Sequence, residues 1–213
     1  MIGVLDLQGG VVEHLDHLER LHIHARRVKT MADLQGLTGL ILPGGESTCL
    51  SRLLRLSGLD EGIRHHSRHG MKCWGTCAGA ILLAKEIETE CPHLGLIDIS
   101  VQRNAFGSQL DSFQATAEVP EVAEDPLPLV FIRSPVISRV GPGVHVLLKV
   151  RGHIAAAESA EVLVTVFHPE LSPSLAFHAY FAHKCGLVPE AGTLPAHAAD
   201  WRLTSWTRLA PIP

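Results

Sequence analysis

The chain has 213 residues, of which 46% are hydrophobic and 19% charged, so it is long enough to bury a full core as one domain and is unlike disordered proteins. Its formal net charge of −4 gives no sign of a nucleic-acid-binding surface, and no apolar run reaches the roughly 18 residues that a membrane span needs. The N-terminus lacks the features of a secretory signal and the cysteine count is odd, so we expect a cytoplasmic protein with reduced thiols and no nucleic-acid or membrane partner.

The first part of the chain alternates between predicted strands and helices. Apolar runs that stop at glycine or proline indicate buried strands, and apolar residues three and four positions apart indicate helices. In chain order, these are a strand at 2–7, a helix at 11–21, a more polar strand at 22–28, a strand at 39–42, a helix with Ser47 or Thr48 as its N-cap, a helix at 59–68 and a strand before Cys77. This alternation predicts right-handed βαβ units and a parallel sheet covered on both faces.

The pattern changes in the second part of the chain. Short segments of alternating apolar and polar residues predict strands, and their close spacing predicts antiparallel hairpins added to the sheet. These segments lie at 97–101, 113–119, 129–133, 144–150, 153–157 and 161–167, and Phe177, Tyr180 and Phe181 mark a closing helix. We therefore expect an α/β, three-layer, doubly wound fold with a largely parallel central sheet and added antiparallel strands. Residues 1–185 would form one domain, and 186–213 a loosely ordered tail rich in proline, alanine and glycine.

One segment, Gly75-Thr76-Cys77-Ala78-Gly79, joins a predicted strand to an apolar helix through a tight corner. The spacing G-x-C-x-G is that of a nucleophile elbow, in which small flanking residues allow a strained turn and expose the central side chain. The start of a helix favours the thiolate form of cysteine, so the pattern predicts Cys77 as a nucleophile. The alternative is an inert buried cysteine, which is common. The spacing of the cysteines does not predict a metal site.

Two further segments fall where strands of a doubly wound sheet end, which is where such folds place functional groups. The segment 42–48, Leu-Pro-Gly-Gly-Glu-Ser-Thr, is either an ordinary turn before a helix or a source of backbone N–H donors for an oxyanion. His168-Pro169-Glu170 offers a general base and, by analogy with known triads, a carboxylate to orient it. His-x-Glu is weak evidence alone, because the chain contains 14 histidines.

In this order, Gly-Gly-Glu-Ser, Gly-Thr-Cys-Ala-Gly and His-Pro-Glu resemble the class I glutamine amidotransferases, which share a flavodoxin-like fold. Other segments narrow the resemblance to the glutaminase subunits of pyridoxal 5′-phosphate synthase, the PdxT/SNO family. These segments are 3–5, 7–9, 13–14, 42–48, 103–107 (Arg-Asn-Ala-Phe-Gly), 109–113, 131–133 and 167–171. Together they span about residues 1 to 183, and the Arg-Asn-x-Phe-Gly stretch is specific to this branch.

The resemblance implies a hydrolysis of L-glutamine to L-glutamate and ammonia. Cys77 would attack the side-chain amide, His168 would transfer protons, Glu170 would orient His168, and the N–H groups of Gly45 and Ala78 would form the oxyanion hole. The positions that match the family's glutamine-binding residues are Gly45, Glu46, Ser47, Arg103, Ile132 and Arg133. The ammonia would pass to a synthase subunit of the PdxS family in a hetero-oligomeric complex. Pyridoxal phosphate would then be a product of the pathway, and we expect neither a cofactor nor a metal.

The sequence also departs from the family pattern, at Asp6, Ser108 and Ser134 and in the length of the tail. Asp6 replaces a small residue and needs a partner or a place at the end of the sheet. Ser108 removes a usual arginine, and Ser134 replaces a usual alanine. Two other functions stay open: a glutaminase subunit for another pathway, such as histidine biosynthesis, and a non-catalytic redox sensor that uses Cys77. A sensor would have no need of His168 and Glu170.

Overall fold

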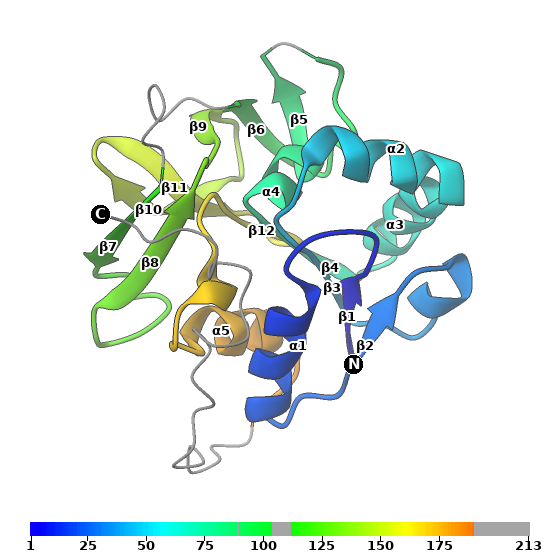
Figure 1. The fold of residues 1–213 in the computed structure, drawn as a ribbon, viewed down its shortest axis with the longest axis horizontal. Helices are drawn as coiled ribbons and strands as arrows, with labels where there is room; N and C mark the ends of the chain where they lie inside the picture. Colours follow the sequence, from blue (N-terminus) through cyan, green and yellow to red (C-terminus); the bar gives the residue numbers. More distant parts are fainter. Residues whose placement is uncertain (89, 104–111, 190–213) are drawn as a thin grey trace.

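Five parallel strands form the centre of the fold in the computed structural model, which describes residues 1–88, 90–103 and 112–189 (Figure 1). Their order is β2-β1-β3-β4-β12, the flavodoxin-like order of a doubly wound sheet. The strands are β1 (Ile2–Leu5), β2 (Ala25–Val28), β3 (Gly39–Leu42), β4 (Lys72–Thr76) and β12 (Val162–Thr165). The more polar strand β2 lies at the edge, and all residues of β1 and β3 are buried.

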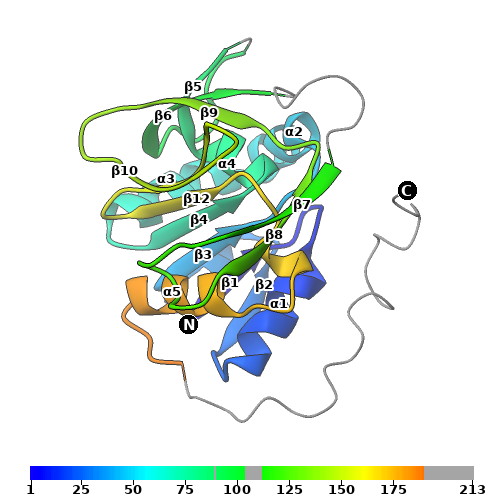
Figure 2. The same ribbon diagram turned by 90° about the vertical axis from the view of Figure 1, so that its left-hand side faces the viewer.

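Two layers of helices cover this sheet, which confirms the predicted three-layer architecture. The helices are α1 (Val11–Arg20), α2 (Ser47–Ser57), α3 (Leu59–Arg68), α4 (Ala78–Leu83) and α5 (Ala176–Lys184). Helices α1 and α5 lie on one face of the sheet, and α2, α3 and α4 lie on the other (Figure 2). Because apolar side chains meet the sheet from both sides, the core is continuous from Leu18 on α1 to Leu50 on α2.

Beyond β12 the main sheet continues through three antiparallel pairings and ends in one parallel pairing. Its order runs on through β11, β9, β6 and β5, and β10 pairs with β11 as a hairpin. These strands are β5 (Ala84–Ile87), β6 (Ile97–Gln102), β9 (Val136–Val140), β10 (His145–Val150) and β11 (His153–Glu158). The sequence did not predict β5 or β9. Strand β5 follows α4 without a turn signal, and only Val136 and Ile137 of β9 are buried, so neither shows a clear period of two.

The remaining two strands correct the expectation that every hairpin extends the main sheet. Strands β7 (Ser112–Ala117) and β8 (Leu127–Ile132) pair only with each other, in antiparallel register. Their inner face packs on the core through Leu127, Leu129 and Phe131. The end of this small sheet contacts a 3₁₀ turn, η2 (Pro169–Leu171), because the Val130 carbonyl accepts a hydrogen bond from the His168 N–H at 2.8 Å. The β7-β8 sheet thus holds the segment that carries His168.

Some predicted features lie outside the described residues. These are the Arg-Asn-x-Phe-Gly stretch after Arg103, the departure at Ser108 and most of the expected tail, from 190 onward. Helix α5 ends at Lys184, and Gly186 follows it with a positive φ of 73°. In the part of the chain that the structure describes, no helix is both long and apolar enough to cross a bilayer.

Candidate active site

Cys77 occupies the corner between β4 and α4 in a strained backbone conformation. Its φ is 48° and its ψ is −105°, values that a residue with a side chain rarely adopts. The Cys77 N–H donates to the Thr165 carbonyl of β12 at 2.8 Å, so the corner is tied to the neighbouring strand. The side chain is 8% exposed and lines a pocket. This is the geometry that the G-x-C-x-G spacing predicted.

The glycines on either side of Cys77 allow the backbone to pack closely. A side chain on Gly79 would overlap the carbonyl oxygen of Leu42 in β3, and one on Gly75 would overlap the backbone of Gly79. Helix α4 therefore lies against β3 and β4 at a distance that only glycine permits. The close packing holds the elbow at the carboxyl edge of the sheet.

His168 and Glu170 meet as a pair next to Cys77. The distance from His168 Nδ1 to Glu170 Oε1 is 2.7 Å, and both side chains are almost fully buried. A hydrogen bond also links the imidazole to the Cys77 side chain. An extended segment does not account for this geometry, because Pro169–Leu171 form the 3₁₀ turn η2, which brings Glu170 back toward the ring. The turn explains how residues two apart in sequence face each other.

The charges of these three side chains shift one another's proton affinity. Burial lowers the pKa of His168, but interactions with Cys77 and Glu170 outweigh it and raise this pKa well above its usual value. Burial raises the pKa of Glu170, but interactions with His168 and His14 outweigh it and hold this pKa below its usual value. A protonated imidazole beside an ionised carboxylate is the charge distribution that these two shifts favour.

A pocket of about 620 Å³ opens above this group at the carboxyl edge of the sheet. Its lining includes every predicted site residue except Glu170, which lies behind His168. The prediction missed the other lining residues: Gln8, Gly9, Gly10, Gly44, Ile81 and Pro135. The position of residues 8–10, directly after β1, was a usable signal, because parallel strands end at the same edge.

Two side chains hold the loop after β3 on either side of Gly45. The Gly44 N–H donates to Thr76 Oγ1 at 3.0 Å, and the Glu46 N–H donates to Gln8 Oε1 at 3.0 Å. A side chain on Gly44 would collide with the ring of His168, so the loop passes directly beside the imidazole. Gly45 and Ala78, the predicted oxyanion donors, both line the pocket.

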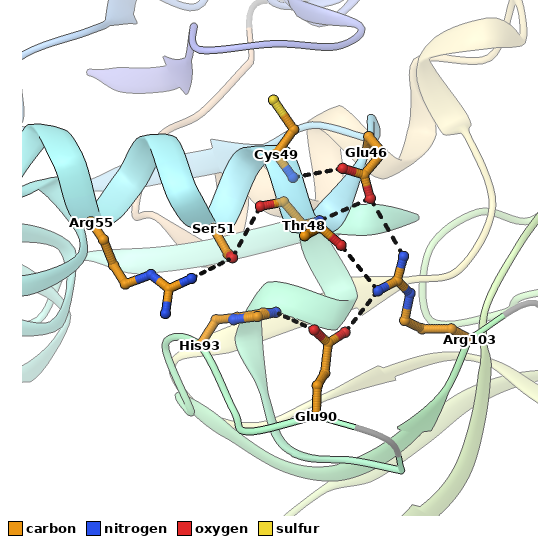
Figure 3. A network of polar contacts seen from close by, with 8 residues as sticks. All are labelled: Glu46, Thr48, Cys49, Ser51, Arg55, Glu90, His93 and Arg103. Carbon is orange, nitrogen blue, oxygen red and sulfur yellow. Dashed lines mark hydrogen bonds and ion pairs between the residues drawn. The ribbon is translucent and has the colours of Figure 1, made fainter.

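Arg103 lies at the rim of the pocket in a network of polar contacts (Figure 3). Its guanidinium donates to Glu90 Oε1 at 2.9 Å and Thr48 Oγ1 at 3.2 Å, and lies 3.4 Å from Glu46 Oε1. These contacts fix the direction of the side chain, as a carboxylate anchor requires. Ile132 and Arg133 line the same pocket, and Cys77 Sγ lies 3.9 Å from the Ile132 carbonyl oxygen.

The same network corrects the predicted N-cap of α2. Glu46, and not Ser47 or Thr48, caps the helix, because its carboxylate accepts from the N–H groups of Thr48 at 3.0 Å and Cys49 at 2.6 Å (Figure 3). A carboxylate suits this place because it satisfies two free N–H groups and is attracted by the positive end of the helix dipole. Ser47 is the first residue of the helix and is buried.

Two of the unusual residues also have a definite place. Asp6 follows the end of β1 and pairs with Arg27 at 3.0 Å and Lys29 at 3.4 Å. Burial raises the pKa of Asp6, but these two cations outweigh it and lower this pKa. Ser134 is buried next to Arg133, which has a positive φ of 46°. Among the described residues, no group of three or more metal-binding side chains could hold a metal ion.

Comparison with known proteins gives one consistent result. The sequence model of the SNO glutamine amidotransferase family matches residues 4–187. The pyridoxal 5′-phosphate synthase subunit PdxT of Syntrophus aciditrophicus is 59% identical over 212 residues, which cover 99% of this chain and 94% of that protein. The subunit of the same name from Clostridium acetobutylicum is 49% identical over 181 residues, which cover 84% and 97%. The first match covers 99% of the chain and so includes nearly all of the segment after 187.

A solved structure agrees with the sequence matches. A crystal structure described as a glutamine amidotransferase superposes with a TM-score of 0.83 and 42% identity, and the match covers 87% of this chain and 99% of that one. The chain therefore shares its fold with that structure over most of its length.

Proposed function

Because the chain belongs to the SNO glutamine amidotransferase family and is therefore a glutaminase subunit, we propose that it hydrolyses L-glutamine with a Cys77–His168–Glu170 triad and delivers the ammonia to a synthase subunit that makes pyridoxal 5′-phosphate. One observation supports this proposal above the others. The strained corner at Cys77 presents a thiol to a 620 Å³ pocket, with an imidazole beside it and a carboxylate behind that imidazole.

The reaction follows from these positions. The Cys77 thiolate attacks the side-chain carbonyl carbon of glutamine, and the amide oxygen takes on negative charge. His168 gives its proton to the nitrogen, the C–N bond breaks and ammonia leaves a thioester on Cys77. His168 then removes a proton from water, which attacks the thioester and releases glutamate. Glu170 keeps the imidazole in the orientation and tautomer that both steps need.

Two groups of residues would hold the substrate. The N–H groups of Gly45 and Ala78 would donate to the oxyanion, while Thr76 and Gln8 occupy the N–H groups on either side of Gly45. Arg103 would bind the α-carboxylate with its forked guanidinium. Glu46, Ser47, Ile132 and Arg133 complete the part of the lining that we assign to glutamine.

The proposed partner is a synthase subunit of the PdxS family, in a hetero-oligomeric complex. The support is the name of the relatives, which are subunits of pyridoxal 5′-phosphate synthase. We also propose a cytoplasmic location, because all five cysteines carry free thiols, as in reducing compartments. Residues 1–185 would act as one glutaminase domain.

A glutaminase assay with and without the synthase subunit tests the proposal. We expect glutamate release that rises when the synthase subunit is added and that falls by at least about 1,000-fold in Cys77→Ala and His168→Asn, since a triad acts as a unit. The variants must still bind the synthase subunit, which size-exclusion chromatography reports. Substantial hydrolysis by Cys77→Ala protein would contradict the proposal. Oxidation of Cys77 by peroxide without labelling by a glutamine analogue would favour the sensor instead.

A further inference from the structure

Three histidines lie buried behind the triad, and the proposed reaction does not use them. His14 and His17 lie on α1, and His178 lies on α5, with exposures of 0%, 3% and 0%. They do not line the pocket. Trp74 packs edge-on against His14 and His178, with ring centroids 5.6 and 4.9 Å apart. Buried imidazoles need hydrogen-bond partners, so the position of their protons matters.

These histidines form a chain that starts at the triad. His14 Nε2 lies 3.5 Å from Glu170 Oε2, a buried oxygen that has no hydrogen-bond partner among the described residues, so this contact is within ion-pair range but is not a formed hydrogen bond. His14 Nδ1 lies 2.8 Å from His178 Nε2, and His178 Nδ1 lies 3.1 Å from His17 Nδ1. At the far end, the His17 ring faces the backbone of Ser172. The Ser172 N–H already donates to Pro169, so the Ser172 carbonyl is the group that faces His17.

The row of three histidines has a hydrogen-bond acceptor at each end and carries one proton fewer than it has junctions. Three rings make four junctions, from Glu170 through His14, His178 and His17 to Ser172, and each junction needs one proton. Three neutral imidazoles supply only three. One junction is therefore left without a proton, and the two arrangements that keep both imidazole–imidazole contacts hydrogen-bonded direct the protons either toward the Glu170 carboxylate or toward the Ser172 carbonyl. Hydrogen bonds to a charged acceptor are about twice as strong as those between neutral groups, so the carboxylate is favoured.

We propose that His14 is a positioning residue of the triad: its Nε2–H is directed at Glu170 Oε2, and His178 and His17 hold it in that tautomer. This inference rests on the proposed function and extends it. Glu170 would then be held on both oxygens, by His168 on Oε1 and by His14 on Oε2. His14 Nε2 also lies 3.4 Å from Thr76 Oγ1, which accepts from Gly44, so the same ring contacts the loop beside the oxyanion site.

The surroundings keep the three rings neutral, which the proton count requires. Burial lowers the pKa of His14 to about 4 and the pKa of His17 to about 3, and it holds the pKa of His178 well below its usual value. The charged groups that face the rings are Glu170 and His168 at one end and Arg20 at the other. At neutral pH, the three imidazole rings thus carry one N–H proton each and no net charge.

The tautomers can be measured directly on the wild-type chain. ¹⁵N-histidine NMR should show the Nε2–H tautomer at His14 and His178 and the Nδ1–H tautomer at His17. The opposite set, with Nδ1–H at His14 and His178, would overturn the proposal. This test needs no variant and does not depend on glutaminase activity, so it separates a failure of this inference from a failure of the proposed function.

A matched pair of substitutions tests the effect on the reaction in complex with the synthase subunit. His14→Asn places its side-chain amide where Nδ1 was, so it has no N–H donor directed at Glu170. His14→Gln places its amide near the position of Nε2, so it keeps an N–H donor to Glu170. We expect His14→Asn to lower kcat by roughly 10- to 100-fold, the effect of a small misplacement of a reacting group, with little change in KM. His14→Gln should recover most of the loss, and the exposed-site control His65→Asn should match wild type.

The outcomes are distinguishable. Native kcat in folded His14→Asn, or equal losses in His14→Asn and His14→Gln together with a lower melting temperature, would contradict a positioning role. If the substitutions prevent folding, the wild-type NMR result decides alone. A wild-type complex without glutaminase activity would contradict the proposed function and not the tautomer assignment.

Discussion

Ser134 is a buried hydroxyl that has no hydrogen-bond partner among the described residues. An unsatisfied buried polar group costs about 1–3 kcal/mol, so Ser134→Ala should increase the free energy of unfolding by about 1 kcal/mol, measured by urea denaturation. Ser172→Ala is the matched control, because the equally buried Ser172 Oγ donates to the Pro169 carbonyl at 3.0 Å. The free energy of unfolding of Ser172→Ala should be lower than that of wild type by about 1 kcal/mol. A loss of stability in both variants would contradict the assignment.

Arg103 allows a second test at the scale of one side chain. If its forked guanidinium binds the α-carboxylate of glutamine, Arg103→Lys should raise KM about tenfold, or about 1.4 kcal/mol, with a smaller change in kcat. The control is Arg139→Lys, because Arg139 also lies between two carboxylates, Glu86 at 3.1 Å and Asp98 at 3.1 Å, but does not line the pocket. A fall in kcat at constant KM would argue against substrate binding by Arg103.

Individual residues show what sequence reasoning could reach. Cys77 and His168 each follow a predicted strand and carry reactive side chains, so they could be singled out before the fold was known. The contacts of Gln8, Thr76 and His14 could not be predicted, because they depend on distances between elements: Gln8 to the Glu46 N–H, Thr76 to the Gly44 N–H and His14 to Glu170. A buried histidine on a helix gives no local signal of its partner.

Among the elements, α2 depends on a cap that a propensity rule for serine and threonine misses. The Glu46 carboxylate accepts from two N–H groups at the start of the helix. Glu46→Ala should therefore lower the free energy of unfolding by about 1 kcal/mol. Glu46→Asp should lower it by less, because aspartate is a preferred N-cap residue. Equal losses in the two variants, measured by chemical denaturation, would show that capping is not the cause.

The elements that the sequence predicted best are those whose apolar residues follow one clear pattern. The strand at 39–42 and the helix at 59–68 match β3 and α3, because a fully apolar run and a helical stripe are both clear. Strand β5 was missed since it follows α4 directly and only Ala84 and Ile87 are buried. The 3₁₀ turn at Pro169 was missed because X-Pro favours an extended residue before proline and says little about the conformation of the residues after it.

At the scale of the whole molecule, the buried histidines make the free energy of unfolding depend on pH. His14 has a pKa of about 4 in the folded chain because of burial, against about 6.5 when unfolded, so between these values the unfolded state binds more protons. Stability must then fall as pH drops from 6.5 toward 4, by roughly 3 kcal/mol for this residue at pH 4. His17 and His178 act in the same direction. His168, whose pKa is raised by its interactions with Cys77 and Glu170, acts in the opposite direction, and its contribution is lost as the pH rises above 6.5.

Urea denaturation at a series of pH values checks this prediction. We expect the free energy of unfolding to drop by several kcal/mol between pH 7 and pH 4.5. His17→Leu should show a weaker dependence than wild type, because it removes one buried imidazole from the apolar side of α1. His65→Gln, at an exposed position on α3, should keep the full dependence. A wild-type curve that stays flat down to pH 4.5 would contradict the prediction.

The pairing of β4 with β12 also has a consequence for the order in which the protein is made. Residues 73–76 of β4 pair with residues 162–165, about 90 residues later in the chain. A ribosome adds roughly 5–20 residues per second, so about 5 to 20 s separate the synthesis of the elbow from that of the strand that completes it. During this time Cys77 has neither His168 nor Glu170 beside it. Under the proposed mechanism, a nascent or prematurely released chain therefore carries the Cys77 thiol without its proposed base until residues 162–170 have been made.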